Sequence, residues 1–174
     1  MKKLYLALAV SLFSFNAQAF VVSPHVGLDY VSATPNGYGH IDRMNGVAGS
    51  VGVKALGFVS LEAFYQQYFS VDVANKTDSK PKAYGVDAVF DTLNLGVVEV
   101  LTTVGYGKYT LDGGTLNKKM KDFEGEAYRA GVGVQFNPTG SIGIRAMYRY
   151  VFPDENVFKK NVQEFTIGLR YYFF

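Results

Sequence analysis

The sequence has 174 residues, of which 14 are Phe, 13 are Tyr, 19 are Gly and none is Cys or Trp. The lack of cysteine excludes a disulfide-stabilised fold, and a formal net charge of +2 leaves no basic surplus for nucleic acid. The length suits one domain, and a composition rich in aromatic residues and glycine favours strands and turns over helices.

The first 19 residues have the three parts of a secretory signal peptide. Two lysines precede an apolar stretch, residues 4–13, and residues 17–19 read Ala-Gln-Ala, the small-x-small pattern of a cleavage site. An uncleaved anchor helix is the alternative, but the apolar stretch is shorter than the roughly 20 residues that cross hydrocarbon. We therefore expect residues 1–19 to be a signal peptide and residues 20–174 to form one exported domain.

The recurring signal after residue 19 is alternation of apolar and polar residues, which predicts strands with two different faces. It is clearest in residues 165–173, where Phe, Ile, Leu, Tyr and Phe alternate with Thr, Gly, Arg and Tyr. Alternation is less regular in residues 96–110, where Leu101 falls among polar residues, and a bulge there would account for it. Eight strands are predicted, near residues 22–32, 45–55, 58–69, 83–91, 96–110, 128–136, 142–150 and 165–173.

The links between these strands alternate in length. Short links near residues 56–57, 92–95 and 137–141 are interleaved with longer, polar links near residues 33–44, 70–82, 111–123 and 152–162. Tight periplasmic turns and longer external loops are typical of outer-membrane barrels, which have an even number of strands. The sequence therefore predicts an all-β fold, an eight-stranded antiparallel up-and-down transmembrane β-barrel whose long links face outward.

Alternation also occurs in soluble barrels of the lipocalin kind, which place the apolar face inside. Here the polar face combines charged residues with many glycines, which suits the narrow interior of an eight-stranded barrel. Because unpaired buried charges are costly, we expect an ion-pair network that plugs the lumen, with a narrow water path for ions as the alternative. His25 is expected to pack in the lumen. The predicted network consists of Asp29, Lys54, Glu62, Asp87, Glu99, Arg129, Arg145, Arg149, Glu164 and Arg170.

The C-terminal residues 168–174 read Gly-Leu-Arg-Tyr-Tyr-Phe-Phe. With this ending and the alternating strands, the sequence resembles the small outer-membrane barrels of the OmpA transmembrane domain, OmpX and AcfA, an outer membrane protein beta-barrel group. The resemblance covers residues 20–174 and implies location in the cell outer membrane, contact with its lipids, and insertion by the barrel assembly machinery. The doubled Phe departs from the pattern, since it leaves one residue beyond the usual final aromatic. The implied assembly signal consists of Gly168, Leu169, Tyr171, Phe173 and Phe174.

Few residues point to catalysis or metal binding. Some eight-stranded outer-membrane barrels act on lipid A through Ser, His and a carboxylate, and His40 and Asp42 lie close together, with Ser32, Ser50 and Ser70 elsewhere. The deacylase pattern of His and Ser two residues apart near the C-terminus is missing. Two histidines, no cysteine and loop acids without EF-hand spacing do not suggest a metal site. No catalytic, cofactor-binding or metal-binding residue is predicted.

Eight lysines fall in the predicted external loops. They could neutralise lipopolysaccharide phosphates or bind acidic host polysaccharides, or they could simply keep the loops soluble. The leading functional hypothesis is a monomer with a structural or surface-interaction role in adhesion, colonisation or envelope stability, because binding specificity usually resides in loops. The alternatives are a narrow ion or small-solute channel and a lipid A-modifying enzyme. The lysines are Lys76, Lys80, Lys82, Lys118, Lys119, Lys121, Lys159 and Lys160.

Overall fold

The computed structural model describes residues 22–35, 43–69, 71–73, 76–113, 123–153 and 161–173. These residues form strands and turns, and no helix among them is long and apolar enough to cross a membrane. The strands are β1 (Val22–Pro35), β2 (Met44–Ala55), β3 (Val59–Tyr68), β4 (Val71–Val73), β5 (Lys76–Asn94), β6 (Val98–Gly113), β7 (Phe123–Phe136), β8 (Ile142–Pro153) and β9 (Val162–Tyr172).

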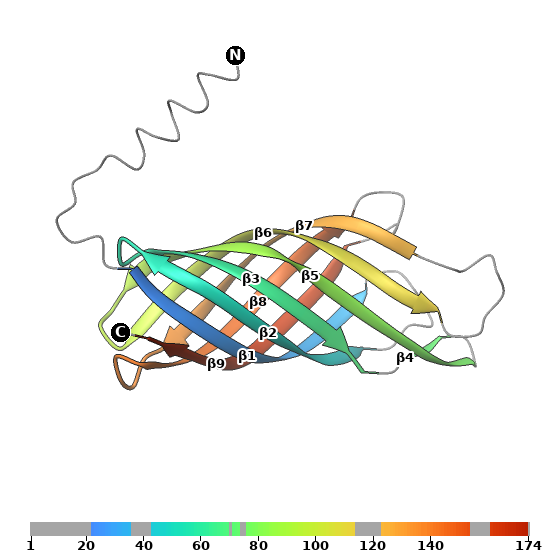
Figure 1. The fold of residues 1–174 in the computed structure, drawn as a ribbon, viewed down its shortest axis with the longest axis horizontal. Helices are drawn as coiled ribbons and strands as arrows, with labels where there is room; N and C mark the ends of the chain where they lie inside the picture. The colour runs from blue at the N-terminus through green and yellow to red at the C-terminus, as the bar shows by residue number, and fades with distance from the viewer. Residues whose placement is uncertain are drawn as a thin grey trace, which may run out of the picture.

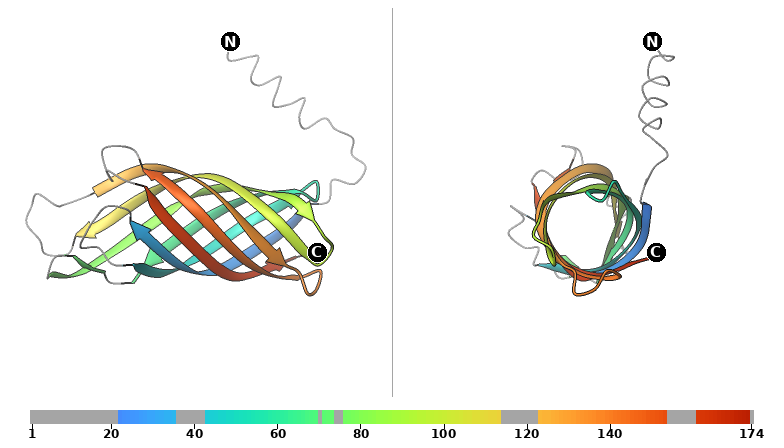
Figure 2. Two further views of the ribbon diagram at one scale, coloured as in Figure 1. Left: turned by 180° about the vertical axis from the view of Figure 1, so that it is seen from behind. Right: turned by 90° about the vertical axis from the view of Figure 1, so that its left-hand side faces the viewer.

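Eight of these strands close into a barrel (Figures 1 and 2). The order around the ring is β3-β2-β1-β9-β8-β7-β6-β5, and antiparallel pairing between β3 and β5 completes it. The short β4 lies outside the ring and pairs with the start of β5. Closure satisfies the backbone groups of every barrel strand within the ring, which a sheet in lipid requires. The predicted eight-stranded antiparallel barrel is confirmed.

The two ends of the barrel differ. The three short turns lie at the same end as the start of β1 and the end of β9, which we call the turn end (Figure 1). There Leu56 and Gly57 both have positive φ, 56° and 74°, within the three residues that separate the paired Ala55 and Val59. The opposite end, which carries the long connections, is called the loop end.

The strands extend farther toward the loop end than predicted. β5 begins at Lys76 rather than near residue 83, and β4 also falls within the predicted link 70–82. Pairing of β5 with β6 reaches Ser79 and Gly113. The hydrophobic alternation ends earlier because it reports only the part of a strand with an apolar face, whereas backbone pairing continues beyond it. The remainder of the long links lies outside the described residues.

The irregularity expected in residues 96–110 lies on the partner strand. The register between β5 and β6 shifts between Asp91 and Leu93, so Thr92 is skipped in the backbone pairing with β6. Leu101 keeps its place on the inner face of β6 and is buried. The bulge is therefore in β5, and β6 alternates regularly.

The barrel exposes its large apolar side chains and buries most of its charges. Leu28, Leu61, Val132 and Leu169 are each more than half exposed on the outer wall. Inside, a small apolar cluster is made by Val31, Ala33, Ala48, Tyr68, Ala127, Val151 and Val162. A barrel in lipid has this arrangement, with apolar residues facing outward and charged residues facing inward.

Candidate functional site: the barrel interior

The ten charged residues predicted for the lumen all project into the barrel interior. Nine are at most 6% exposed, and the side chain of Lys54 is 15% exposed. Asp91 joins them, with a side chain 6% exposed against Lys54. The sequence contained a signal for Asp91, since it lies four residues after Asp87 on β5, but its position at the end of the predicted strand hid its role.

A central layer of the interior is organised around Glu62. Its Oε1 accepts a hydrogen bond from Arg145 Nη1 at 2.7 Å and lies 3.0 Å from His25 Nε2. Its Oε2 lies 3.9 Å from Arg170 Nη2. Glu62 is on β3 and Arg145 on β8, which are opposite each other in the ring. This ion pair therefore crosses the whole diameter of the barrel.

Arg170 and Asp29 form a second pair between the neighbouring strands β9 and β1. The guanidinium donates two hydrogen bonds of 2.9 Å to the two carboxylate oxygens, the bidentate geometry that is strongest for this pair. Glycines provide the space. A Cβ on Gly168 would lie 2.3 Å from Asp29 Oδ1, and a Cβ on Gly27 would lie 2.5 Å from Arg170 Nη1.

A third group of charges lies nearer the loop end. Arg129 donates from Nε to Asp87 Oδ1 at 2.6 Å and makes a further hydrogen bond to Oδ2, while its Cζ lies 3.4 Å from the ring centroid of Phe64. Arg149 Nη1 lies 3.3 Å from Glu164 Oε1. Arg129 Nη1 lies 3.7 Å from the same oxygen, so the two pairs are joined.

Uncharged polar groups complete the coordination of Glu164. Its Oε2 accepts hydrogen bonds from Gln66 Nε2 at 2.8 Å and Tyr68 Oη at 3.2 Å. Tyr68 also belongs to the apolar cluster defined above. The charged layer therefore meets an apolar layer directly, and both fill the interior.

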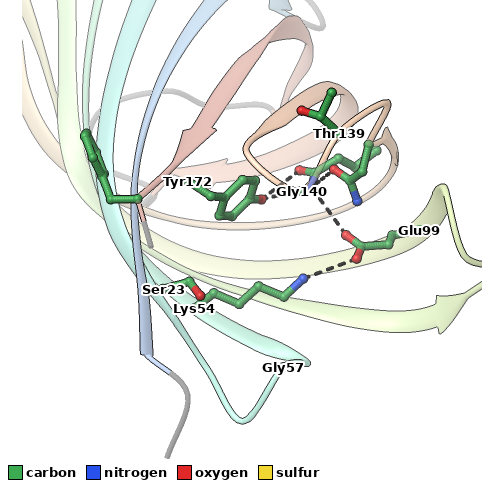
Figure 3. A pocket seen from close by; sticks show the side chains of 10 residues that line it. Ser23, Lys54, Gly57, Glu99, Thr139, Gly140 and Tyr172 are labelled. Carbon is green, nitrogen blue, oxygen red and sulfur yellow. Dashed lines mark hydrogen bonds and ion pairs between the residues drawn. The ribbon is translucent and has the colours of Figure 1, made fainter.

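A cavity of about 310 Å³ lies at the turn end of the barrel (Figure 3). Lys54 and Glu99 point toward each other across it, with 3.3 Å between Nζ and Oε1, and Lys54 Nζ is 2.5 Å from Asp91. Gln135 donates to Glu99 at 3.3 Å and accepts a hydrogen bond from Arg145 Nε at 2.9 Å. Gln135 therefore connects the lining of this cavity to Arg145 in the central layer.

The residues considered for catalysis that the structure describes are not brought together. His25 Nε2 is engaged by Glu62, Ser50 is buried inside the barrel, and His40, Asp42 and Ser70 lie outside the described residues. Within the described ranges, no group of three or more His, Asp or Glu side chains could hold a metal ion. The chemistry of the interior is therefore that of mutual charge neutralisation.

The assembly residues occupy both faces of β9. Leu169, Tyr171 and Phe173 point outward, and the rings of Tyr171 and Phe173 meet edge-to-face at 5.0 Å. Gly168 packs against Asp29, and Phe174 lies outside the described residues. We propose that this strand carries the signal for the barrel assembly machinery, with Phe173 as its terminal aromatic residue.

Deleting Phe174 is expected to leave membrane insertion intact, because Phe173 already supplies the outward aromatic residue at the end of β9. Replacing Phe173 with alanine should reduce insertion strongly. The fraction of heat-modifiable barrel in outer-membrane preparations measures both effects. Complete loss of insertion on deletion of Phe174 alone would show that Phe174 is the terminal aromatic residue of the signal.

A closed barrel with an apolar outer wall and a charge-paired interior defines an integral outer-membrane β-barrel protein. A family model described as the outer membrane protein beta-barrel domain matches residues 5–173, and the chain belongs to this family. It is a protein of the cell outer membrane. No curated protein matches it significantly.

Solved structures share the fold at low identity. The N-terminal β-barrel domain of Pseudomonas aeruginosa OprF is 16% identical with a TM-score of 0.62, covering 86% of this chain and 97% of that one. Neisserial surface protein A is 19% identical with a TM-score of 0.57, covering 87% and 97%. Ail, the attachment invasion locus protein of Yersinia pestis, in complex with the heparin analogue sucrose octasulfate, is 19% identical with a TM-score of 0.54, covering 87% and 97%.

Proposed function

We propose that this protein is a rigid, non-catalytic outer-membrane scaffold that makes contacts at the cell surface through its long connections. The observation that supports this proposal most strongly is that paired side chains fill the interior of the barrel. Ion pairs cross the barrel at the level of Glu62 and Arg145, and Glu164 is held by two arginines and two uncharged donors. A barrel whose interior is occupied in this way leaves its ends as the surfaces for function.

The channel alternative has less support. Ion flow needs a hydrated path, whereas the charged residues of the interior are nearly all buried and paired with opposite charges. The cavity at the turn end is lined by Glu99, Gln135 and Tyr172, and Gln135 bonds to the other two and to Arg145 of the central layer. The lipid A-modifying enzyme also has less support, because the described residues contain no triad of Ser, His and a carboxylate.

The partners that fit this role are polyanions and lipids. Lysines are frequent in the long connections, and cations there favour phosphate or sulfate groups, so lipopolysaccharide and acidic host polysaccharides are the proposed ligands. The complex of Ail with a heparin analogue supports the idea that such a barrel can present a polyanion site. We further propose that the protein acts as a monomer.

Orientation in the membrane can be tested because the chain has no cysteine, so a single introduced thiol is unique. Asn117→Cys, in a long connection, is expected to react with a membrane-impermeant maleimide on intact cells. Thr139→Cys, in a turn, should react only after lysis. Labelling of Thr139→Cys from outside would reverse the proposed orientation.

The functional test is a variant in which residues 36–42, 71–75, 114–122 and 154–160 are replaced by short Gly-Ser links. The barrel should still insert, as judged by heat-modifiable mobility, because the ring closes through strand pairing. Binding of expressing cells to heparin-coated and host-cell surfaces should fall to the level of cells without the protein. Undiminished binding by the shortened variant would contradict a role for the long connections.

A further inference from the structure

A groove on the outer wall lies at the loop end of β1, β2, β8 and β9. Its volume is about 440 Å³, and the side chains lining it include Ser32, Thr34, Arg43, Asn45, Gln163 and Phe165. These four strands are neighbours in the ring. The groove opens on the surface that faces the membrane, not on the interior.

The strand register arranges the groove in rows. The row nearest the middle of the barrel is apolar, with Val47, Tyr30 and Ile167 paired across β2, β1 and β9 and each 44–46% exposed. In the next row Ser32 lies between Asn45 and Phe165.

The last row, nearest the loop end, is polar. Thr34 pairs with Gln163 there, and Arg43 precedes the start of β2 on the other side of Thr34. Along the barrel axis the wall thus changes from hydrocarbon-like to hydroxyl and amide groups and then to a guanidinium. A phosphorylated glycolipid presents its groups in the same order, from acyl chains to the hydroxyl and amide groups of the sugar and then to phosphate.

Charge distinguishes this groove from the opposite wall. No Asp or Glu is among the described residues that line it. On the opposite wall, Lys108 of β6 lies directly across from Glu126 of β7, so an acidic side chain accompanies the cations there. Asn45 adds a further feature, because its Oδ1 is shielded from solvent and has no hydrogen-bond partner among the described residues.

We propose that this groove binds a phosphorylated glycolipid of the outer leaflet. Arg43 holds a phosphate, because a guanidinium offers paired donors that match phosphate oxygens. Ser32, Thr34 and Asn45 bond the sugar, and the acyl chains lie over Tyr30 and Ile167. A phospholipid has no sugar, so it would leave the hydroxyl and amide groups of Ser32, Thr34 and Asn45 without these hydrogen-bond partners. The site is on the barrel wall and is independent of any ligand of the long connections.

The test is native mass spectrometry of the full chain in detergent micelles titrated with diphosphoryl lipid A. Arg43→Ala should lower the affinity about tenfold, the usual consequence of losing a hydrogen bond to a charged group, and Arg43→Lys should fall in between. Lys108→Ala is the matched control, with the same charge change on the opposite wall, and should alter the affinity less than twofold. Ser32→Ala with Thr34→Ala should weaken binding while leaving Arg43 in place.

Three outcomes would overturn the proposal. Equal losses in Arg43→Ala and Lys108→Ala would indicate general charge attraction. Unchanged binding of dephosphorylated lipid A would show that the groove does not recognise the phosphate. Equal affinity for phosphatidylglycerol and lipid A would show that the groove does not recognise the sugar. A variant shortened only in residues 114–122 and 154–160 should retain lipid A binding, so failure of the surface role and failure of this site are distinguishable.

Discussion

Replacing Glu62 with alanine is expected to lower the free energy of unfolding by about 3–5 kcal/mol, the usual effect of removing one partner from a buried ion pair. The change leaves Arg145, which is 2% exposed, without its 2.7 Å partner and removes the acceptor of His25. Arg145→Ala should cost a similar amount, since it leaves the carboxylate of Glu62 in the interior. Unfolding in urea, followed by circular dichroism on protein in lipid vesicles, measures these changes.

The double variant identifies the pair itself. Because Glu62 and Arg145 share one contact, their combined effect should be smaller than the sum by about 1–3 kcal/mol. Glu126→Ala, which removes an acid from the outer face of β7, is the control and should change stability by about 0.5 kcal/mol or less. Additive effects well below 1 kcal/mol for Glu62→Ala and Arg145→Ala would mean that both residues are hydrated.

Gly85→Ala is expected to destabilise the barrel by about 1–3 kcal/mol or more, as overpacking of a filled interior does. A Cβ at residue 85 would lie 2.2 Å from the carbonyl oxygen of Tyr106 and 2.9 Å from Cε1 of Phe64. Neither can move freely, because the first is backbone in the β5–β6 ladder and the second supports Arg129.

Gly49→Ala is the matched comparison, because no atom lies within 4 Å of its Cβ position on β2. It should be neutral or stabilise the barrel by about 0.4–1 kcal/mol, since alanine reduces the freedom of the unfolded chain. Urea unfolding midpoints of the two variants should therefore shift in opposite directions or by very different amounts. Similar shifts for both would show that the space around Gly85 does not limit the packing.

Much of the barrel could be predicted from the sequence because the period of a strand is two. Alternation in residues such as 165–173 assigns each side chain to one face, and with charges and glycines on the inner face it distinguishes a membrane barrel from a soluble one. The inward position of Arg170 and the outward position of Leu169 follow directly from this pattern.

Three features depend on geometry that the sequence does not express. The partner of each interior charge depends on how strands are staggered around the ring, so the meeting of Glu62 with both Arg145 and His25 follows only from the closed barrel. The full length of β5 depends on pairing with β6 rather than on side-chain pattern. The lipid groove joins four strands, with Arg43 outside any predicted strand.

We propose that the interior, which is filled by paired charges, does not conduct ions. Planar-bilayer recording of the purified full chain tests it most directly. We expect no stable conductance steps from the wild-type protein, and Glu62→Ala with Arg145→Ala should show steps if its folded fraction is matched to wild type, because that change opens the central layer. Reproducible, ion-selective steps from the wild-type barrel would show that the interior holds a hydrated path and would establish a channel.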